Sequence, residues 1–300
     1  MKSVLSIKKP KTPQSALRPL VFDSPHSGSI YPEDFKHACD QSILERAEDN
    51  HVDDLFSCVP DHGANLLLAH FPRSYIDVNR SQDDIDAELL AEQWPGNSGA
   101  DFPINPTSRS SAGIGLIRRL VKPGMPVYDR ALSSEEIMHR IEKYYRPYHN
   151  ALADLIETTH YNFGQAWHIN CHSMPSASAY PKRAIGLVGG NPRASDFVLG
   201  DRDGTTCDPA FTRTLRDYIK SLGYTVTIND PFKGVELVEK YSNPARGYHS
   251  IQIEINKALY MNEETNARNG NYENLKSHIN TITAFIAQHI ESKLVNLAAD

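Results

Sequence analysis

Residues 249–256 read HSIQIEIN, and their strict alternation predicts a β-strand with two chemically different faces. The three isoleucines would face one side of a sheet, with Gln252 and Glu254 on the other. A carboxylate near the interior of a sheet is costly unless it pairs with a cation or with metal-bound water. Glu254 is therefore a candidate general base. The alternative is a solvent-facing glutamate on a half-buried strand.

Two other apolar segments end in a polar turn that contains His-Ser. Residues 20–22 run into DSPHSG at 23–28, and residues 166–170 end at Cys-His-Ser. In an open α/β sheet, ligands bind beyond the carboxyl ends of the strands, so we expect His26 and His172 at a site. A catalytic zinc often uses two histidines and one carboxylate and keeps an open position for water. The competing interpretation is that each histidine only caps its strand through hydrogen bonds.

The carboxylate of such a site could come from EDNHVD, residues 48–53. Asp49 could supply it, with Glu48, His51 and Asp53 as competitors. The two histidines are too far apart along the chain to form a local metal motif, so spacing does not choose among these four.

Arginine is the natural partner of a carboxylate because its planar guanidinium makes two parallel hydrogen bonds. Four arginines stand in loop or loop-edge settings: Arg73, Arg80, Arg118 and Arg246. They are candidates for binding an anionic substrate. For any one of them, the alternative is a solvated surface charge.

Apolar segments of strand length alternate along the chain with helical segments, which indicates an α/β domain. Further strands are expected at 64–71, 75–78, 184–188 and 224–228. A helical stripe is expected at 40–59, and helices at 133–160, between Asp208 and Gly223, and at 272–297. Residues 83–125 are rich in Gly, Pro, Asn and Ser, and long loops of this kind often form part of a binding site.

The chain has 300 residues, of which 40% are hydrophobic, and its net charge is −6. This mild acidity argues against a dedicated nucleic-acid binder. No segment approaches the roughly 18 apolar residues that cross a bilayer, and residues 1–18 lack the apolar run of a secretory signal. The four cysteines form no CxxC pair, so we expect a reduced, cytoplasmic protein. We also expect a mobile N-terminal tail over 1–18 and a single domain over 19–300.

Five segments, taken in their order, resemble the N-formylglutamate amidohydrolase family. They are DSPHSG (23–28), DNHVDDLF (49–56), PRSYIDVNR (72–80), NCHSMP (170–175) and YHSIQIEINKALYM (248–261). The resemblance extends over roughly residues 19–292. It implies a three-layer α/β/α sandwich with a mixed central sheet, of the zinc-exopeptidase (phosphorylase/hydrolase-like) type that is similar to zinc carboxypeptidases and aspartoacylases.

The resemblance also implies roles for individual residues. The implied ligands of one zinc ion are His26, Asp49 and His172, the implied base is Glu254, and the implied substrate-binding residues are Arg73, Asn79, Arg80, Arg118 and Arg246. The sequence departs from the wider pattern at Ser29, where a glutamate would follow the first histidine. It also has Asn170 where family members often carry Asp two residues before the second histidine. An asparagine could orient the imidazole, but as a neutral partner it would raise ligand basicity less.

The implied activity is zinc-dependent hydrolysis of N-formyl-L-glutamate to formate and L-glutamate. The expected partner is therefore a small-molecule N-acyl amino acid, with no nucleic acid and no membrane. One alternative is a zinc deacylase or carboxypeptidase that acts on another N-acyl amino acid or short peptide. An alternative of another class is a catalytically silent carboxylate-binding protein with the same fold.

Overall fold

A computed structural model of the protein describes residues 3–297 except 12, 14–16, 96–101 and 183–192. Contacts between Cα atoms divide the chain into two compact units. The first comprises residues 1–6, 25–50 and 68–151, and the second comprises 7–24, 51–67 and 152–300. The expectation of a single domain over 19–300 stays a prediction. Among the described residues, no helix is long and apolar enough to span a membrane.

The main sheet of the described chain has seven strands. Their order is β1 (Leu5–Lys8), β3 (Asn65–Ala69), β2 (Leu20–Ser24), β6 (Ala166–Met174), β9 (Tyr248–Asn256), β7 (Phe197–Gly200) and β8 (Val226–Ile228). Strands β2, β6 and β9 run parallel, whereas β7 is antiparallel to β9 and parallel to β8, so the sheet is mixed. The register of β6 and β9 places His172 directly opposite Glu254.

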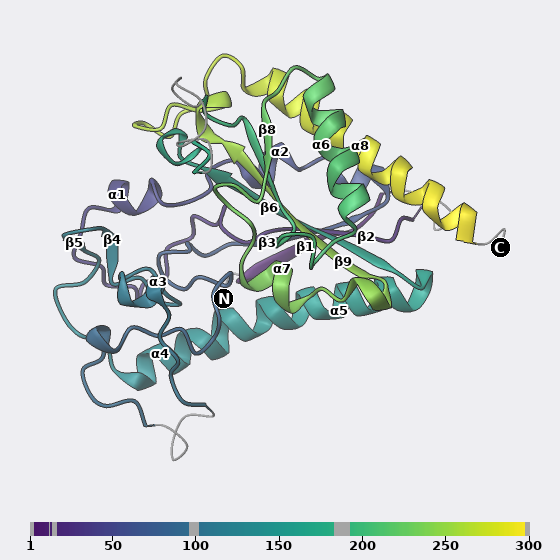
Figure 1. The fold of residues 1–300 in the computed structure, drawn as a ribbon. Coiled ribbons are helices and arrows are strands. Elements are labelled where there is room, and N and C mark those ends of the chain that lie inside the picture. Colours follow the sequence, from purple (N-terminus) through teal and green to yellow (C-terminus); the bar gives the residue numbers. More distant parts are fainter. Residues whose placement is uncertain (1–2, 12, 14–16, 96–101, 183–192, 298–300) are drawn as a thin grey trace. The chain divides into compact units, whose positions relative to one another are not determined.

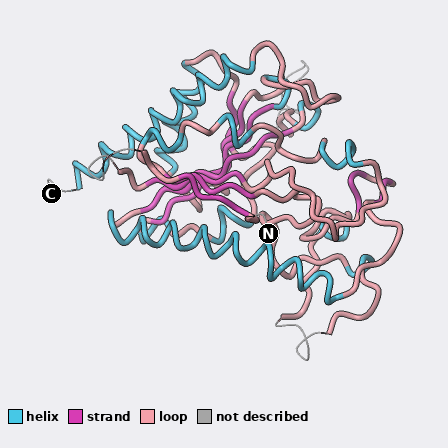
Figure 2. Tube along the Cα trace, turned by 180° about the vertical axis from the view of Figure 1, so that it is seen from behind, coloured by secondary structure: helices cyan, strands magenta, loops and turns pink. Residues whose placement is uncertain are grey.

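Helices cover both faces of the sheet in the second unit. Helices α6 (Pro209–Ser221) and α8 (Tyr272–Leu297) lie on one face (Figure 1). Helix α7 (Glu236–Lys240) and the later part of α5 (Arg146–Phe163) lie on the other, and Figure 2 shows the strands enclosed between the two helical layers. Every residue of β2, β6 and β7 is buried, as expected for strands covered on both faces. The predicted three-layer α/β/α sandwich with a mixed sheet is confirmed.

The first unit consists mostly of loops with short elements. These are α1 (Gln41–Glu45), α3 (Ser108–Ser111), α4 (Ser134–Arg140), a 3₁₀ turn (Ala87–Leu89) and the antiparallel pair β4 (Leu120–Lys122) and β5 (Met125–Pro126). Arg140 is fully buried, and its guanidinium donates to the main-chain oxygen of Tyr75 and to the Tyr128 hydroxyl. This buried cation ties α4 to the segment 72–80, which carries several of the predicted site residues.

Several predicted helices are present with the expected ends. Helix α6 begins after Asp208, whose side chain accepts from the N–H of Ala210, and it stops before Gly223, which has a φ of 94°. Ser133 caps α4 by accepting from the N–H of Glu136. The helix predicted at 133–160 is built from α4, a π-helical segment (Ile141–Tyr145) and α5.

Two predictions around the site were wrong. The stripe at 40–59 is not one helix: α1, α2 (Val52–Leu55) and a 3₁₀ turn (Val59–His62) are separated, because His51 adopts a left-handed φ of 67° that no α-helix continues through. Residues 75–78 form turns instead of a strand, since the segment is closed by short-range main-chain hydrogen bonds such as Arg80 N–H to the Asp77 oxygen.

The N-terminal segment also differs from the prediction of a mobile tail, because Leu5–Lys8 is β1 at the edge of the sheet. Its alternation of apolar and polar residues suits an edge strand, and the His70 ring bonds to the Ser3 main-chain oxygen and the Ser6 hydroxyl. Strand β7 was not predicted, and the strand predicted at 184–188 lies outside the described residues. Short 3₁₀ turns at Ser176–Ser178, Pro244–Arg246 and Lys257–Leu259 complete the elements of the second unit.

Candidate metal centre

His26 lies in the turn that follows β2 and is held there by its main chain and its ring. Gly28 permits the close approach of this turn to the segment 70–80, because a Cβ atom at Gly28 would lie 2.4 Å from the carbonyl carbon of His70. The His26 Nε2 atom lies 2.7 Å from Asp77 Oδ1. On the other side of the ring, Nδ1 lies 3.4 Å from Asp49 Oδ2.

Asp77 fixes the tautomer of this imidazole. It is fully buried, and burial raises the pKa of a carboxyl group, but the nearby charge of Arg73 and the hydrogen bond from His26 hold the pKa of Asp77 well below its usual range. Arg73 Nη2 donates to Asp77 Oδ2 over 2.8 Å. An ionised carboxylate can only accept, so Nε2 of His26 carries the proton and Nδ1 is the nitrogen that could bind a metal.

Asp49 is placed beside His26 by main-chain hydrogen bonds. The Asp49 N–H donates to the His26 carbonyl oxygen over 3.0 Å, and the Ser27 hydroxyl donates to the Asp49 carbonyl oxygen over 2.9 Å. The Asp49 carboxylate is 2% exposed, and Arg73 Nη1 lies 3.8 Å from its Oδ1. Of the competing residues, Glu48 accepts from the Tyr31 hydroxyl, and the His51 ring bonds to the Asn266 carbonyl oxygen.

His172 lies within β6, two residues after Asn170, on the same side of the strand. Its Nε2 lies 2.7 Å from Asn170 Oδ1, and Asn170 Nδ2 donates to Asp23 Oδ1 over 2.7 Å. Because the amide nitrogen of Asn170 faces a carboxylate, its oxygen must face His172. Nε2 of His172 is therefore the donor, and Nδ1 is the nitrogen that could bind a metal.

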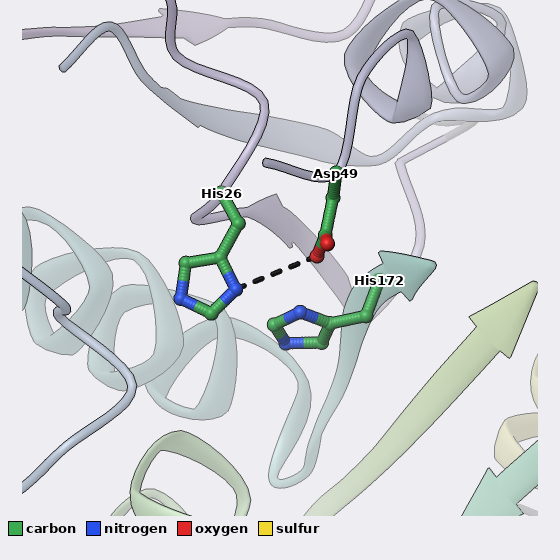
Figure 3. Close-up of side chains that lie close together, drawn as sticks. All are labelled: His26, Asp49 and His172. Atoms are coloured by element: carbon green, nitrogen blue, oxygen red, sulfur yellow. Dashed lines mark ion pairs between the residues drawn. The ribbon is translucent and has the colours of Figure 1, made fainter. Parts of the chain in front are cut away.

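These three side chains form a group that could hold a metal ion. In the part of the chain that the structure describes, His26, Asp49 and His172 are the one such set found, and their ligand atoms all lie within 4.8 Å of one another (Figure 3). Tetrahedral zinc with ligands at about 2.0–2.1 Å would separate them by about 3.3–3.4 Å, which matches the 3.4 Å between His26 and Asp49. Two imidazoles with fixed tautomers and one carboxylate are a donor set that fits zinc.

Glu254 lies on strand β9, which is paired with the strand that carries His172. It lies on β9 opposite His172 and is 8% exposed, so the alternative of a solvent-facing glutamate was wrong. The Gln252 side-chain amide donates to Glu254 Oε1 over 2.8 Å. Each strand thus carries a buried amide two residues before the residue of interest, Asn170 before His172 and Gln252 before Glu254.

The arginines of the first unit differ in the number of protein groups to which their guanidinium groups are hydrogen-bonded. Arg73 is bonded to Asp77, and Arg80 donates to the main-chain oxygens of Ile114 and Asn79. Burial lowers the pKa of Arg80 to about 10. Arg118 has no hydrogen-bond partner for its buried Nε among the described residues. Burial, together with the positive charge of Arg73, lowers the pKa of Arg118 to about 9, although Asp77 opposes this shift.

The structure does not bring Arg246 to the proposed base. Arg246 is exposed in the 3₁₀ turn that precedes β9, and its main-chain oxygen accepts from the His160 ring. The six steps of extended strand from Tyr248 to Glu254 advance by about 20 Å. Parallel strands bring together at their carboxyl ends the residues that follow them, whereas Arg246 precedes its strand, so the assignment of Arg246 to the site stays a prediction.

Sequence reasoning named Asn170 beside His172 but missed the partners of His26 and of Glu254. Asp77 stood in the quoted motif without a role, and Asp23 and Gln252 had none. The period of two along β9 could have found Gln252, because residues two apart on a strand share a face. No local signal connects Asp77 to His26, since 51 residues separate them along the chain.

Comparisons with known proteins show the family to which the chain belongs. A sequence profile described as N-formylglutamate amidohydrolase matches residues 18–261. An N-formylglutamate deformylase from Pseudomonas aeruginosa is 28% identical over 272 residues, with 88% of each chain covered. The crystal structure of N-formylglutamate amidohydrolase from Ralstonia eutropha JMP134 is 40% identical, with a TM-score of 0.88, 97% of this chain covered and 99% of that chain.

A crystal structure of an Agrobacterium tumefaciens protein is 15% identical to this chain, with a TM-score of 0.61, 99% of this chain covered and 97% of that chain; it shares the fold alone. The fold, the candidate metal group and these relatives define a hydrolase that acts on an amide bond. The chain belongs to the N-formylglutamate amidohydrolase family.

Proposed function

We propose that the protein is a zinc-dependent amidohydrolase that converts N-formyl-L-glutamate and water to formate and L-glutamate. The observation that carries the proposal is the group His26, Asp49 and His172, whose ligand atoms lie within 4.8 Å of one another in a chain 40% identical to an N-formylglutamate amidohydrolase. His26, Asp49 and His172 would hold the ion. When bound, zinc supplies polarisation of the formyl carbonyl and a lowered pKa, about 7, for its water.

Glu254 is the proposed general base. Its carboxylate takes a proton as the water oxygen bonds to the formyl carbon, and it delivers that proton to the amide nitrogen as the C–N bond breaks. The proton therefore ends on the leaving glutamate amine, and formate keeps the new C–O bond. The hydrogen bond from Gln252 holds one carboxylate oxygen of Glu254, which fixes the direction in which the group presents itself.

Arg118 is the proposed main anchor for a substrate carboxylate. Its buried Nε has no protein partner among the described residues, so an incoming carboxylate would supply the acceptor that this N–H lacks. Arg73 and Arg80 add positive charge close to Arg118, since both lower its pKa. Arg80 and Asn79 also shape the turn that holds Asp77, because the Asn79 N–H donates to Asp77 Oδ1 over 3.0 Å.

The test is metal analysis of the purified protein together with hydrolysis assays. We expect one zinc per chain and turnover of N-formyl-L-glutamate that a chelator abolishes and added zinc restores. N-acetyl- and N-succinyl-L-glutamate serve as matched substrates that differ only in the acyl group. Turnover of these with none of the formyl compound would overturn the substrate assignment alone, whereas no stoichiometric zinc together with no turnover would overturn the enzyme.

A further inference from the structure

A chain of buried side chains leads away from His172 within the second unit. Asn170 bonds to the His172 ring and donates to Asp23 Oδ1 over 2.7 Å. The same Asp23 oxygen lies 2.9 Å from His168 Nε2, and His168 Nδ1 lies 2.7 Å from the Ser250 hydroxyl. All five residues are at most 3% exposed. None of the three residues beyond Asn170 has a part in the reaction proposed above.

Strand pairing holds this chain in place. Asp23 on β2 is the register partner of Asn170 on β6, and Ser250 on β9 is the register partner of His168. His168, Asn170 and His172 are two residues apart along β6, so their side chains share one face of the sheet. Buried strands cannot shift by one residue without turning these side chains to the other face. The geometry is therefore fixed by the fold and not by a mobile loop.

The two candidate histidine ligands differ in the hydrogen-bond partner of their Nε2 atoms. His26 Nε2 bonds directly to a carboxylate, that of Asp77. His172 Nε2 bonds to a neutral amide, and a carboxylate stands one residue further on, at Asp23. An amide whose N–H donates to a carboxylate is polarised, and its carbonyl becomes a stronger acceptor through the chain of hydrogen bonds. The negative charge of Asp23 can thus act on His172 although the two do not touch.

We propose that Asp23 is a positioning residue for His172, acting through Asn170, with His168 and Ser250 holding the Asp23 carboxylate. This relay from Asp23 through Asn170 to His172 fixes the Asn170 amide with its oxygen toward the ring. It keeps the proton of His172 on Nε2 and strengthens Nδ1 as a metal ligand. This inference rests on the proposed function to the extent that it assigns His172 a metal. His172 thus has an amide and a more distant carboxylate where His26 has a direct carboxylate partner.

The first test is zinc affinity, measured by competition with a chromophoric chelator at fixed pH. Asp23→Asn keeps the shape and removes the charge, and we expect zinc binding 10–100-fold weaker, the range found when such supporting groups are lost. Asn170→Asp alone places two carboxylates in the 2.7 Å contact and should also weaken binding. The double variant Asp23→Asn/Asn170→Asp moves the carboxylate next to His172 and reverses the hydrogen bond, so it should recover most of the wild-type affinity.

A matched control separates the relay from general loss of stability. Asp208→Asn removes the carboxylate that caps α6 and pairs with Lys293, so it should lower the melting temperature and leave zinc affinity unchanged. A double variant as weak as the two single variants would overturn the relay, because a purely structural role predicts no rescue. Wild-type zinc affinity in Asp23→Asn would overturn it as well.

A second measurement is independent of the metal. In the metal-free protein, nitrogen-15 NMR of the His172 ring should report a protonated Nε2 that exchanges slowly with water, and Asp23→Asn should speed that exchange at least severalfold. Unchanged exchange in Asp23→Asn would overturn the relay. Failure of the wild-type protein to bind zinc or to hydrolyse N-formyl-L-glutamate would instead count against the proposed function, and the ring signal would still decide the relay.

Discussion

Replacing Arg118 with methionine should make the protein more stable and less active at the same time. Arg118 is partly buried, its buried Nε has no partner among the described residues, and burial lowers its pKa from its ordinary, much higher value to about 9. At about 1.4 kcal/mol per pH unit, this shift sets an upper limit of about 5 kcal/mol on the cost of the charge to folding. Since the residue keeps some contact with solvent, we expect Arg118→Met to gain about 1–3 kcal/mol.

The pH dependence of this gain follows from the direction of the shift. A base whose pKa is lowered by folding destabilises the folded state at every pH below its folded pKa. The cost fades as the pH rises above about 9 toward the ordinary pKa of arginine. The stability difference between Arg118→Met and the wild type should therefore be constant between pH 6 and 8 and shrink above about 9.

The same substitution should cost about 10–150-fold in kcat/KM for N-formyl-L-glutamate, the range for a lost hydrogen bond to a charged group. Chemical denaturation and steady-state kinetics measure the two effects on one preparation. Arg118→Lys is the matched control, because it keeps the charge but loses the planar fork, and we expect intermediate activity with no gain in stability. An Arg118→Met protein with wild-type kcat/KM, or one that is less stable than the wild type, would refute the reasoning.

Three further predictions concern the metal group, the base and a buried histidine. Glu254→Gln keeps the hydrogen bond from Gln252 but cannot take a proton, so kcat should fall about 10²–10⁴-fold with zinc content unchanged; near-normal turnover would exclude Glu254 as the base. Asp77→Asn removes the charge that fixes His26, so zinc should bind about 10–100-fold more weakly in chelator competition, and an unchanged affinity would contradict the role given to Asp77. Burial lowers the pKa of His249 to about 4. Below pH 6.5, His249 therefore binds a proton in the unfolded chain but stays neutral in the folded chain, and the free energy of unfolding should fall by about 1–3 kcal/mol between pH 6.5 and 4. Denaturation at pH 7 and pH 4.5 should show a smaller loss in His249→Gln than in the wild type, and equal losses would count against this assignment.

Local pattern was enough to predict most of the central sheet. Alternating isoleucines around Glu254 and continuous apolar residues before His26 and His172 are properties of short segments, and the strands lie where these patterns placed them. The helix starts at Ser133 and Asp208 were also predictable from local sequence, because each capping side chain accepts from a main-chain N–H within three residues. The pattern wrongly predicted a strand at 75–78, because the apolar residues of this segment are buried in main-chain turns and not in an extended strand.

Local sequence could not decide whether Glu48 or Asp49 supplies the carboxylate of the candidate metal group. Glu48 and Asp49 are neighbours of the same chemical type, and both are buried. The main-chain bond from Asp49 to His26 turns one carboxylate toward the imidazole, and the Tyr31 hydroxyl engages the other. Nothing within six residues of either position distinguishes them, since the deciding partners lie 17 and 23 residues away.

The sequence by itself determined which side chains share a face of each strand and which histidines follow a strand, because side-chain direction in an extended chain has a period of two residues. Only the tertiary structure decided the partners, Asp77 for His26 and Asp23 behind Asn170. It also decided that the Nε atom of Arg118 is buried while Arg246 is exposed. These partners are brought together by strand order and loop packing, which depend on contacts between segments tens to more than a hundred residues apart. Short-range periodicity carries no information about such contacts.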